Sequence, residues 1–230
     1  MRARHEDGAS VSAPVRAGVV EAALNEDGSP VSAQVSARVL EDGALVSALV
    51  RAEALEAGLK VLAGRVLPVV RMPAAVLSEP CEAVDPCDSA VVALAADLLA
   101  TMAVSPGCVG LAANQVGVGW RVFSLDVGGH PKTRGYHGRF VLCNPSLVSA
   151  SRMQKGREGC MSVPDWTGDV KRATRVVVAG ELPGSGEPVT VETDGFEAVA
   201  MQHELDHLDG LLFLDRVADA GAVHRRKVYL

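Results

Sequence analysis

The sequence predicts an α+β fold, with antiparallel or mixed β-sheets packed around a central helix near the C-terminus. Three observations support this class. One helical pattern lies near the middle of the chain, four strand-like runs follow it, and a second helical pattern comes directly after the last run. Strands that follow one another without an intervening helical pattern favour antiparallel pairing over the parallel pairing of β-α-β units.

The first helix is predicted to begin after Asp88 or Ser89, because either side chain can accept a hydrogen bond from the first turn. The pair Pro106-Gly107 ends its pattern. The apolar positions between these limits recur at spacings of three and four, and they are Val91, Leu94, Ala95, Leu98 and Met102. This spacing indicates one apolar face.

The four strands are predicted from short runs rich in β-branched and other apolar residues. They span residues 121–127, 140–143, 174–179 and 189–192. The run Pro183-Gly184-Ser185-Gly186 predicts a turn between the last two strands.

The second helix is predicted to begin at Asp194, because Asp194 and Glu197 form an acidic N-cap signature, and to end at Gly210. Asp206 and Asp209 lie off its apolar stripe. The members of that stripe recur at spacings of three and four, and they are Phe196, Val199, Ala200, His203 and His207. We expect this stripe to face the core.

The second helix also carries the pattern His-Glu-x-x-His, formed by His203, Glu204 and His207. Two histidines four residues apart lie on one helix face, where both imidazoles reach a single metal ion. Glu204 adjoins the first histidine, where a general base for a metal-bound water is needed. The alternative is a pair of core histidines satisfied by hydrogen bonds, but the glutamate between them favours a metal site.

The third metal ligand is expected upstream of this helix. Phe213 stands where one group of metalloproteases has a third histidine, and no glutamate follows Glu204. The remaining downstream candidates lie on a tail too short to build the second half of a typical protease cleft, and they are Asp215, Asp219 and His224.

Cys160 is the strongest upstream candidate for this ligand. It follows Gly159 and lies near Pro164, on a constrained loop or strand edge that can aim a thiolate. One cysteine and two histidines leave a fourth metal position open for water, as catalytic sites require. We interpret the other cysteines as small buried hydrophobes, and they are Cys81, Cys87, Cys108 and Cys143.

A further segment, residues 107–117, combines small residues with the amide side chain of Gln115. Small residues permit a ligand to approach the backbone closely, and the Gln115 amide can donate a hydrogen bond to a developing oxyanion. A tight connection between a helix and a strand explains this segment equally well.

Three segments of the chain, in the order in which they occur, resemble the motifs of the peptide deformylase family. They are Cys108-Val109-Gly110-Leu111-Ala112-Ala113-Asn114-Gln115, then Glu158-Gly159-Cys160-Met161-Ser162, then Gln202-His203-Glu204-Leu205-Asp206-His207. Cys108 replaces a glycine of the first motif and Met161 a leucine of the second, and neither change removes a catalytic group. The resemblance covers roughly residues 59–230.

This resemblance implies a metal-dependent hydrolase that removes the formyl group from the N-terminal formyl-methionine of newly synthesised polypeptides. A metal-bound water would attack the formyl carbon, with Glu204 as general base and then general acid. Gln115 and the backbone N–H of Met161 would receive the oxyanion. The implied metal ligands are Cys160, His203 and His207.

The resemblance also implies a slot for the methionine side chain and a particular metal. Fe²⁺ is expected in the cell, with Ni²⁺, Co²⁺ or Zn²⁺ able to substitute, and a thiolate on ferrous iron predicts oxygen-sensitive activity. The slot would lie beside the ring of His203, and its lining residues would be Val109, Gly110, Phe196, Val199 and Ala200.

Composition limits the partners and the compartment. The chain has 230 residues, a formal net charge of -6 and a pI of about 5.5. This mild acidity argues against nucleic-acid binding, although a transient contact with the ribosome is compatible with it. The odd number of cysteines fits a reducing compartment, and the sequence shows neither an apolar run of membrane-spanning length nor a secretory signal. We therefore expect a cytoplasmic protein. The family resemblance implies that its partners are nascent N-formylmethionyl peptides.

Residues 1–58 differ from the remainder of the chain. A twelve-residue unit begins at Glu6, at Glu26 and at Glu41, and the segment contains no aromatic residue. We expect a flexible, repeat-bearing N-terminal extension that has no counterpart in the family pattern, with a helix possible over residues 39–59. Residues 59–230 would form the catalytic domain.

Two alternative functions are compatible with a metal-binding helix of this kind. The first is a small metallopeptidase, which the missing downstream ligand and the short tail disfavour. The second is a non-catalytic, metal-stabilised binding module. A structural metal site needs neither a base such as Glu204 nor an oxyanion donor such as Gln115, and it prefers four protein ligands.

Overall fold

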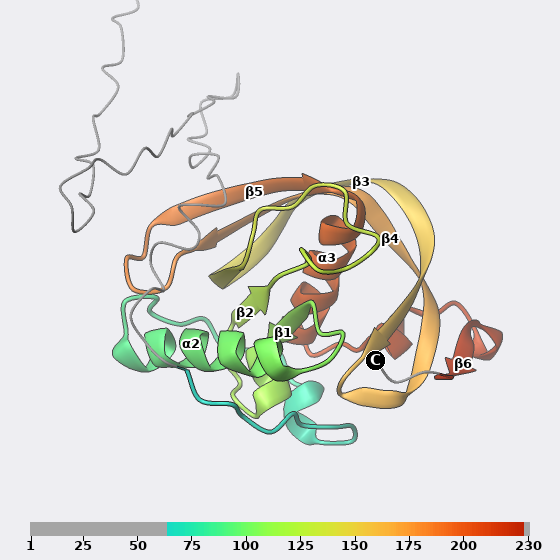
Figure 1. The fold of residues 1–230 in the computed structure, drawn as a ribbon, viewed down its shortest axis with the longest axis horizontal. Helices are drawn as coiled ribbons and strands as arrows, with labels where there is room; N and C mark the ends of the chain where they lie inside the picture. Colours follow the sequence, from blue (N-terminus) through green and yellow to red (C-terminus); the bar gives the residue numbers. More distant parts are fainter. Residues whose placement is uncertain (1–63, 228–230) are drawn as a thin grey trace, which may run out of the picture. The chain divides into compact units, whose positions relative to one another are not determined.

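The computed structural model describes residues 64–227 of the chain (Figure 1). The extension predicted for residues 1–58 and the helix expected over residues 39–59 lie outside the described residues. The described elements are η1 (Ala75–Leu77), α2 (Ser89–Val104), β1 (Gly110–Ala112), η2 (Ala113–Val116), β2 (Val122–Leu125), β3 (Phe140–Cys160), β4 (Val163–Glu181), β5 (Pro188–Asp194), α3 (Gly195–Leu208), η3 (Phe213–Arg216), η4 (Ala220–Ala222) and β6 (Val223–Arg225).

The strands form one antiparallel sheet, whose order is β1-β2-β3-β4-β5, with β6 paired to β4. Figure 1 shows α3 enclosed by the curved sheet, and α3 contacts β1, β2, β4 and β5. The predicted α+β class, with a central helix packed among antiparallel strands, is therefore confirmed. None of the helices in residues 64–227 is long and apolar enough to cross a membrane.

The β3–β4 hairpin is much longer than the sequence predicts. The strands predicted over 140–143 and 174–179 cover only part of β3, which has 21 residues, and of β4, which has 19. Residues 146–157 of β3 are all exposed, so this stretch lacks the alternation of apolar and polar residues that marks a half-buried strand. The hairpin turns directly after Cys160, which pairs with Val163.

The first predicted helix is confirmed as α2. The side chain of Asp88 accepts a hydrogen bond from the backbone N–H of Ala90 and so forms the N-cap. The helix ends at Val104, before the predicted stop. All five predicted apolar positions are buried, and they are Val91, Leu94, Ala95, Leu98 and Met102.

The second predicted helix is confirmed as α3 together with its stop at Gly210, but the predicted N-cap signature does not form. Asp194 is the N-cap residue without forming a side-chain capping bond. Glu197 is instead fully buried, where it accepts hydrogen bonds from the backbone of His137 and the hydroxyl of Thr193. The helix stops before Gly210, whose φ of 74° suits glycine at the C′ position.

The face of α3 that packs into the core also differs from the prediction. The most deeply buried apolar residues of the helix are Ala198, Met201, Leu205 and Leu208. Phe196, Val199 and His203 of the predicted stripe are only partly buried. Because the curved sheet surrounds α3, almost every face of the helix is covered, and apolar spacing alone did not distinguish its core face from a face that lines a pocket.

Candidate metal centre and active site

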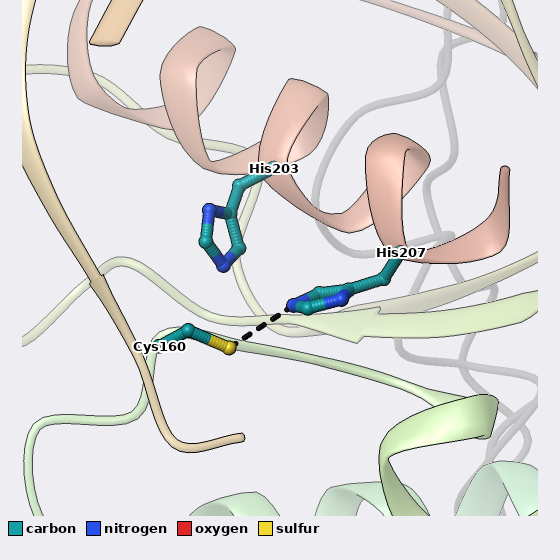
Figure 2. A group of neighbouring side chains, drawn as sticks. All are labelled: Cys160, His203 and His207. Carbon is teal, nitrogen blue, oxygen red and sulfur yellow. Dashed lines mark hydrogen bonds between the residues drawn. The ribbon is translucent and has the colours of Figure 1, made fainter. Parts of the chain in front are cut away.

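Three side chains from two elements converge beneath the sheet. Cys160 is the last residue of β3, whereas His203 and His207 lie one turn apart on α3. Figure 2 shows both rings projecting from the helix toward the cysteine sulfur. One ligand atom from each residue lies within 4.8 Å of the others, and Cys160 Sγ is 3.2 Å from His207 Nε2. The structure thus brings together the three residues proposed as metal ligands.

His203 is oriented by a carboxylate that the sequence analysis did not assign a role. Its Nδ1 atom lies 3.0 Å from Glu158 Oε2, which leaves Nε2 for a metal. Arg172 holds Glu158 through two hydrogen bonds, of 2.8 and 3.0 Å. Glu158 lies two residues before Cys160 on the same strand, so one segment supplies a ligand and the residue that positions another ligand.

Arg172 connects this carboxylate to a second one. It also donates to Asp206 on α3, and Asp206 accepts two hydrogen bonds from Arg216. Glu158, Arg172 and Asp206 are all at least 90% buried. Buried charges are retained only when paired, so Arg172 is the partner that allows Glu158 and Asp206 to remain charged inside the protein.

The metal centre carries charge before any metal binds. Burial raises the pKa of the Cys160 thiol, but the adjacent His207 and His203 outweigh burial and hold that pKa well below its usual value. Burial lowers the pKa of His203, but Cys160 and Glu158 outweigh it and hold that pKa well above its usual value. A buried thiolate with two imidazoles is a donor set suited to a divalent ion of borderline softness, which would replace the proton.

Glu204 lies beside the two histidines with one oxygen unengaged. It is buried, and within residues 64–227 its Oε2 atom has no hydrogen-bond partner. Burial raises the pKa of Glu204 to about 7, against the opposing charges of His203 and His207. A carboxyl group with a pKa near neutrality can both accept and return a proton, as a general base requires.

Gly110 of β1 makes room for Glu204. A Cβ atom added at Gly110 would lie 2.3 Å from Glu204 Oε1, which no real side chain tolerates. A side chain at position 110 would therefore displace the carboxylate of Glu204, and this close approach explains one small residue of the segment 107–117.

Gln115 lies in η2 with its amide oriented by the backbone. Its Oε1 atom accepts a hydrogen bond from the N–H of Ala112 at 3.0 Å. Its Nε2 atom donates to Cys160 Sγ at 3.3 Å and to Ser162 Oγ at 3.2 Å. The donor face of the amide is therefore directed at the metal centre, where a developing oxyanion would need it.

A pocket of about 770 Å³ opens onto these groups. Cys160, Met161, His203 and Glu204 contribute to its wall, as does Gln115. All the residues expected to form the methionine slot also line it, and they are Val109, Gly110, Phe196, Val199 and Ala200. Four of the five residues of the helix stripe that we expected to face the core line this pocket, and only His207 is fully buried.

The remaining cysteines differ in their surroundings. Cys81 and Cys143 are buried, as expected for small hydrophobes. Cys108 is half-buried and lines the pocket, with its thiol 3.1 Å from the carbonyl oxygen of Gly110. Cys87 is exposed, so its interpretation as a buried hydrophobe is wrong. It lies in the turn before α2, which leaves it on the surface.

The network around Glu158 predicts an acid-sensitive fold. Burial raises the pKa of Glu158, but hydrogen bonds from His203 and Arg172 outweigh it and lower that pKa from 4.5 to about 2. The stabilisation is complete above the unfolded pKa and is lost as pH falls through the folded pKa. In urea titrations of metal-free protein, stability is expected to fall between about pH 4.5 and about pH 2. The stability of the Glu158→Gln variant should fall less over that range. Equal dependence of stability on pH for the two proteins would contradict this assignment.

Fold and centre together define a class of protein, an α+β hydrolase with a Cys-His-His metal centre and an adjoining buried carboxylate at a pocket. Residues 66–222 match the family model described as polypeptide deformylase, and the chain belongs to that family.

Known relatives agree with this assignment. The chain is 43% identical over 152 residues to a peptide deformylase of Heliobacterium modesticaldum, an alignment that covers 66% of this chain and 94% of that protein. It is 45% identical over 142 residues to a peptide deformylase of Acidothermus cellulolyticus, which covers 62% of this chain and 73% of that protein.

Solved structures show the same similarity. The structure of a peptide deformylase from Ehrlichia chaffeensis in complex with actinonin has a TM-score of 0.63 and 32% identity, covering 69% of this chain and 92% of that one. The Met-Ala-Ser bound structure of the enzyme from Acinetobacter baumannii has a TM-score of 0.60 and 35% identity, covering 66% of this chain and 98% of that one.

The chain is therefore a metal-dependent hydrolase of protein biosynthesis, which removes N-terminal formyl groups from nascent polypeptides. The family resemblance predicted from the three motifs is confirmed. Neither the metallopeptidase nor the non-catalytic binding module is supported by the family match.

Proposed function

We propose that Cys160, His203 and His207 hold one divalent metal ion and that Glu204 transfers the proton during deformylation. The observation that carries this proposal is the cluster of one sulfur and two nitrogen donors within 4.8 Å of one another. The cluster is buried at a pocket and adjoins a carboxylate whose Oε2 has no partner in residues 64–227. A purely structural site would not require that carboxylate.

The proton path follows from the position of Glu204. Cys160, His203 and His207 would hold a divalent ion, which would act as a Lewis acid and lower the pKa of a bound water toward neutrality. Glu204 accepts a proton from the attacking water and returns it to the departing amine nitrogen. The carbon–nitrogen bond of the formamide breaks, and the products are formate and a peptide with a free α-amine.

In this proposal Gln115 and the backbone N–H of Met161 stabilise the oxyanion by donating hydrogen bonds to it. The Nε2 group of Gln115 already points at the metal centre, and Met161 follows Cys160 in the hairpin turn and lines the pocket. An oriented amide and a backbone N–H stabilise negative charge on the formyl oxygen as it develops. Because Ala112 holds the Gln115 amide in place, little reorganisation is needed during the reaction.

The substrate is a nascent peptide that begins with formyl-methionine. We place its first side chain in the slot whose lining residues are Val109, Gly110, Phe196, Val199 and Ala200. The slot is walled by apolar side chains from the face of α3 that lines the pocket and by Val109 and Gly110 at β1. The formyl group is bonded to the α-nitrogen of this methionine, so this placement directs it toward His203 and Glu204, which line the same pocket.

We propose Fe²⁺ as the metal in the cell, with Ni²⁺, Co²⁺ or Zn²⁺ able to replace it. An iron-loaded sample kept in air is expected to lose formate-releasing activity, because a thiolate ligand on ferrous iron is open to oxidation. A zinc-loaded sample is the matched control, since Zn²⁺ has no redox chemistry. Full activity of the iron form after long storage in air would contradict this choice of metal.

We also propose that residues 59–230 form the catalytic domain and residues 1–58 an extension, in a protein of the cytoplasm. Every residue assigned a role lies between Val109 and His207, which supports this division. A transient contact with the ribosome is compatible with a substrate that is still being synthesised.

A further inference from the structure

The mouth of the pocket is rich in basic side chains, although the whole chain has a net charge of -6. Five exposed cations line it, from the loop after β2 and from the β3–β4 hairpin. They are Lys132, Arg152, Lys155, Arg157 and Arg175. One exposed carboxylate, Asp194, lines the same pocket.

Nearby carboxylates neutralise only part of this charge. Lys155 and Arg157 share one partner, Asp169, at 3.2 and 2.6 Å. Arg175 pairs with Glu192. Together with Asp194, three carboxylates therefore face five cations, and an excess of positive charge is left at the entrance.

Lys132 and Arg152 form no ion pair among residues 64–227. The Nζ atom of Lys132 lies 5.8 Å from the centre of the Phe196 ring, and the ring of His130 stacks on the same Phe196 at 3.9 Å. Phe196 is a wall of the proposed methionine slot. Lys132 is exposed and therefore lies at the edge of that slot, where we expect the residues after methionine to leave it.

Arg152 is held in an unusual backbone conformation. Its φ angle is 61°, in the left-handed region that residues other than glycine seldom adopt. The hydroxyl of Thr174 on β4 donates to the carbonyl oxygen of Arg152 at 2.8 Å and so helps to hold this conformation. Backbone held in this way is concentrated at ligand sites, and here it lies within a long exposed strand beside the pocket.

We propose that this basic mouth selects nascent peptides with aspartate or glutamate directly after formyl-methionine, an inference that rests on the proposed placement of methionine in the slot. The formyl group removes the positive charge of the N-terminus, so the first charges to meet the mouth are those of the second and third side chains. A low-dielectric cleft lined by one sign of charge attracts the opposite sign.

Two C-terminally amidated peptides test the proposal, formyl-Met-Glu-Glu-amide and formyl-Met-Gln-Gln-amide. They differ in charge but hardly in shape, and amidation removes the terminal carboxylate. At low ionic strength kcat/KM is expected to be about tenfold higher for the glutamate peptide, mainly through a lower KM. Because salt screens exposed charges, the ratio should approach one in about 1 M salt.

A charge reversal makes the test specific to the mouth. The double variant Lys132→Glu with Arg152→Glu is expected to prefer formyl-Met-Lys-Lys-amide over the glutamate peptide, the reverse of the native order. Arg139→Glu is the matched control, because Arg139 is exposed but does not line the pocket. That variant should keep the native order, since its reversed charge lies outside the mouth.

Formate release from the uncharged glutamine peptide reports on the proposed function separately from the charge preference. Equal kcat/KM for the glutamate and glutamine peptides at low salt, with formate released from both, would overturn the proposal. Equal kcat/KM for these two peptides, combined with weaker binding of ribosomal RNA by the double variant, would also overturn the proposal. That result would indicate that the basic mouth binds RNA instead.

Discussion

Glu204→Gln is expected to lower formate release by about 10²- to 10⁴-fold while the protein keeps its metal. The substitution preserves the size of the side chain but removes its capacity to accept a proton. Glu204 is not one of the three proposed ligands, so metal content measured on the purified variant should equal that of the native protein. The effect should fall on kcat rather than on KM, because the slot for methionine is unchanged.

Asp209→Asn is a suitable control for this experiment. Asp209 follows the last turn of the same helix, is exposed, and does not line the pocket. Its variant should retain both metal and turnover. Native turnover by Glu204→Gln would remove Glu204 from the proton path, and loss of metal together with turnover would make Glu204 part of the metal site instead.

Arg172→Met is expected to lower the free energy of unfolding by about 3–5 kcal/mol. The guanidinium bridges Glu158 and Asp206, and all three side chains are buried. Removing only the cation leaves carboxylates in a low-dielectric interior with fewer partners. Urea denaturation of metal-free protein measures the loss, provided that the slope of the transition is unchanged.

Two comparisons separate burial from simple loss of an ion pair. Arg175 lies on β4, as Arg172 does, and forms an exposed ion pair with Glu192 of β5. Arg175→Met should therefore lower the free energy of unfolding by only about 0–1 kcal/mol. Adding Glu158→Gln and Asp206→Asn to Arg172→Met should recover much of the loss, because the stranded charges are removed too. Similar losses for Arg172→Met and Arg175→Met would contradict the role assigned to the buried network.

The parts of the fold that follow from local chemistry were predictable. Asp88 has a capping side chain and an apolar periodicity after it, and α2 begins there. His203 and His207 are four residues apart, so any helix over that segment places them on one face. The order of strands and helices was also enough to predict an α+β fold, because it required no knowledge of which strands pair.

The features that the sequence analysis missed depend on distant pairing. The exposed part of β3 has no alternation of apolar and polar residues, so the length of the β3–β4 hairpin could not be predicted from the sequence. Arg172 reaches Glu158 only because that hairpin folds back on itself, and it reaches Asp206 only because α3 lies beneath the hairpin. Neither contact has a local sequence signal.

Apolar spacing assigned one face of α3 to the core, whereas the family resemblance placed Phe196 and Val199 at the slot for methionine. The α3 stripe of Phe196, Val199 and His203 has the spacing of a core face, yet it lines a pocket. Spacing identifies residues that share a face of a helix. It does not tell whether that face meets the sheet or a cavity, since both surroundings favour apolar side chains.

The most direct test of the account is release of formate from a formyl-Met-Ala-Ser peptide by anaerobically purified protein, with Cys160→Ser as the control. The native protein is expected to release formate, and the variant to release little because it lacks the soft thiolate ligand. Bound metal is measured in both samples. Formate release by Cys160→Ser at the native rate, or none from native protein with its metal bound, would contradict the proposed centre.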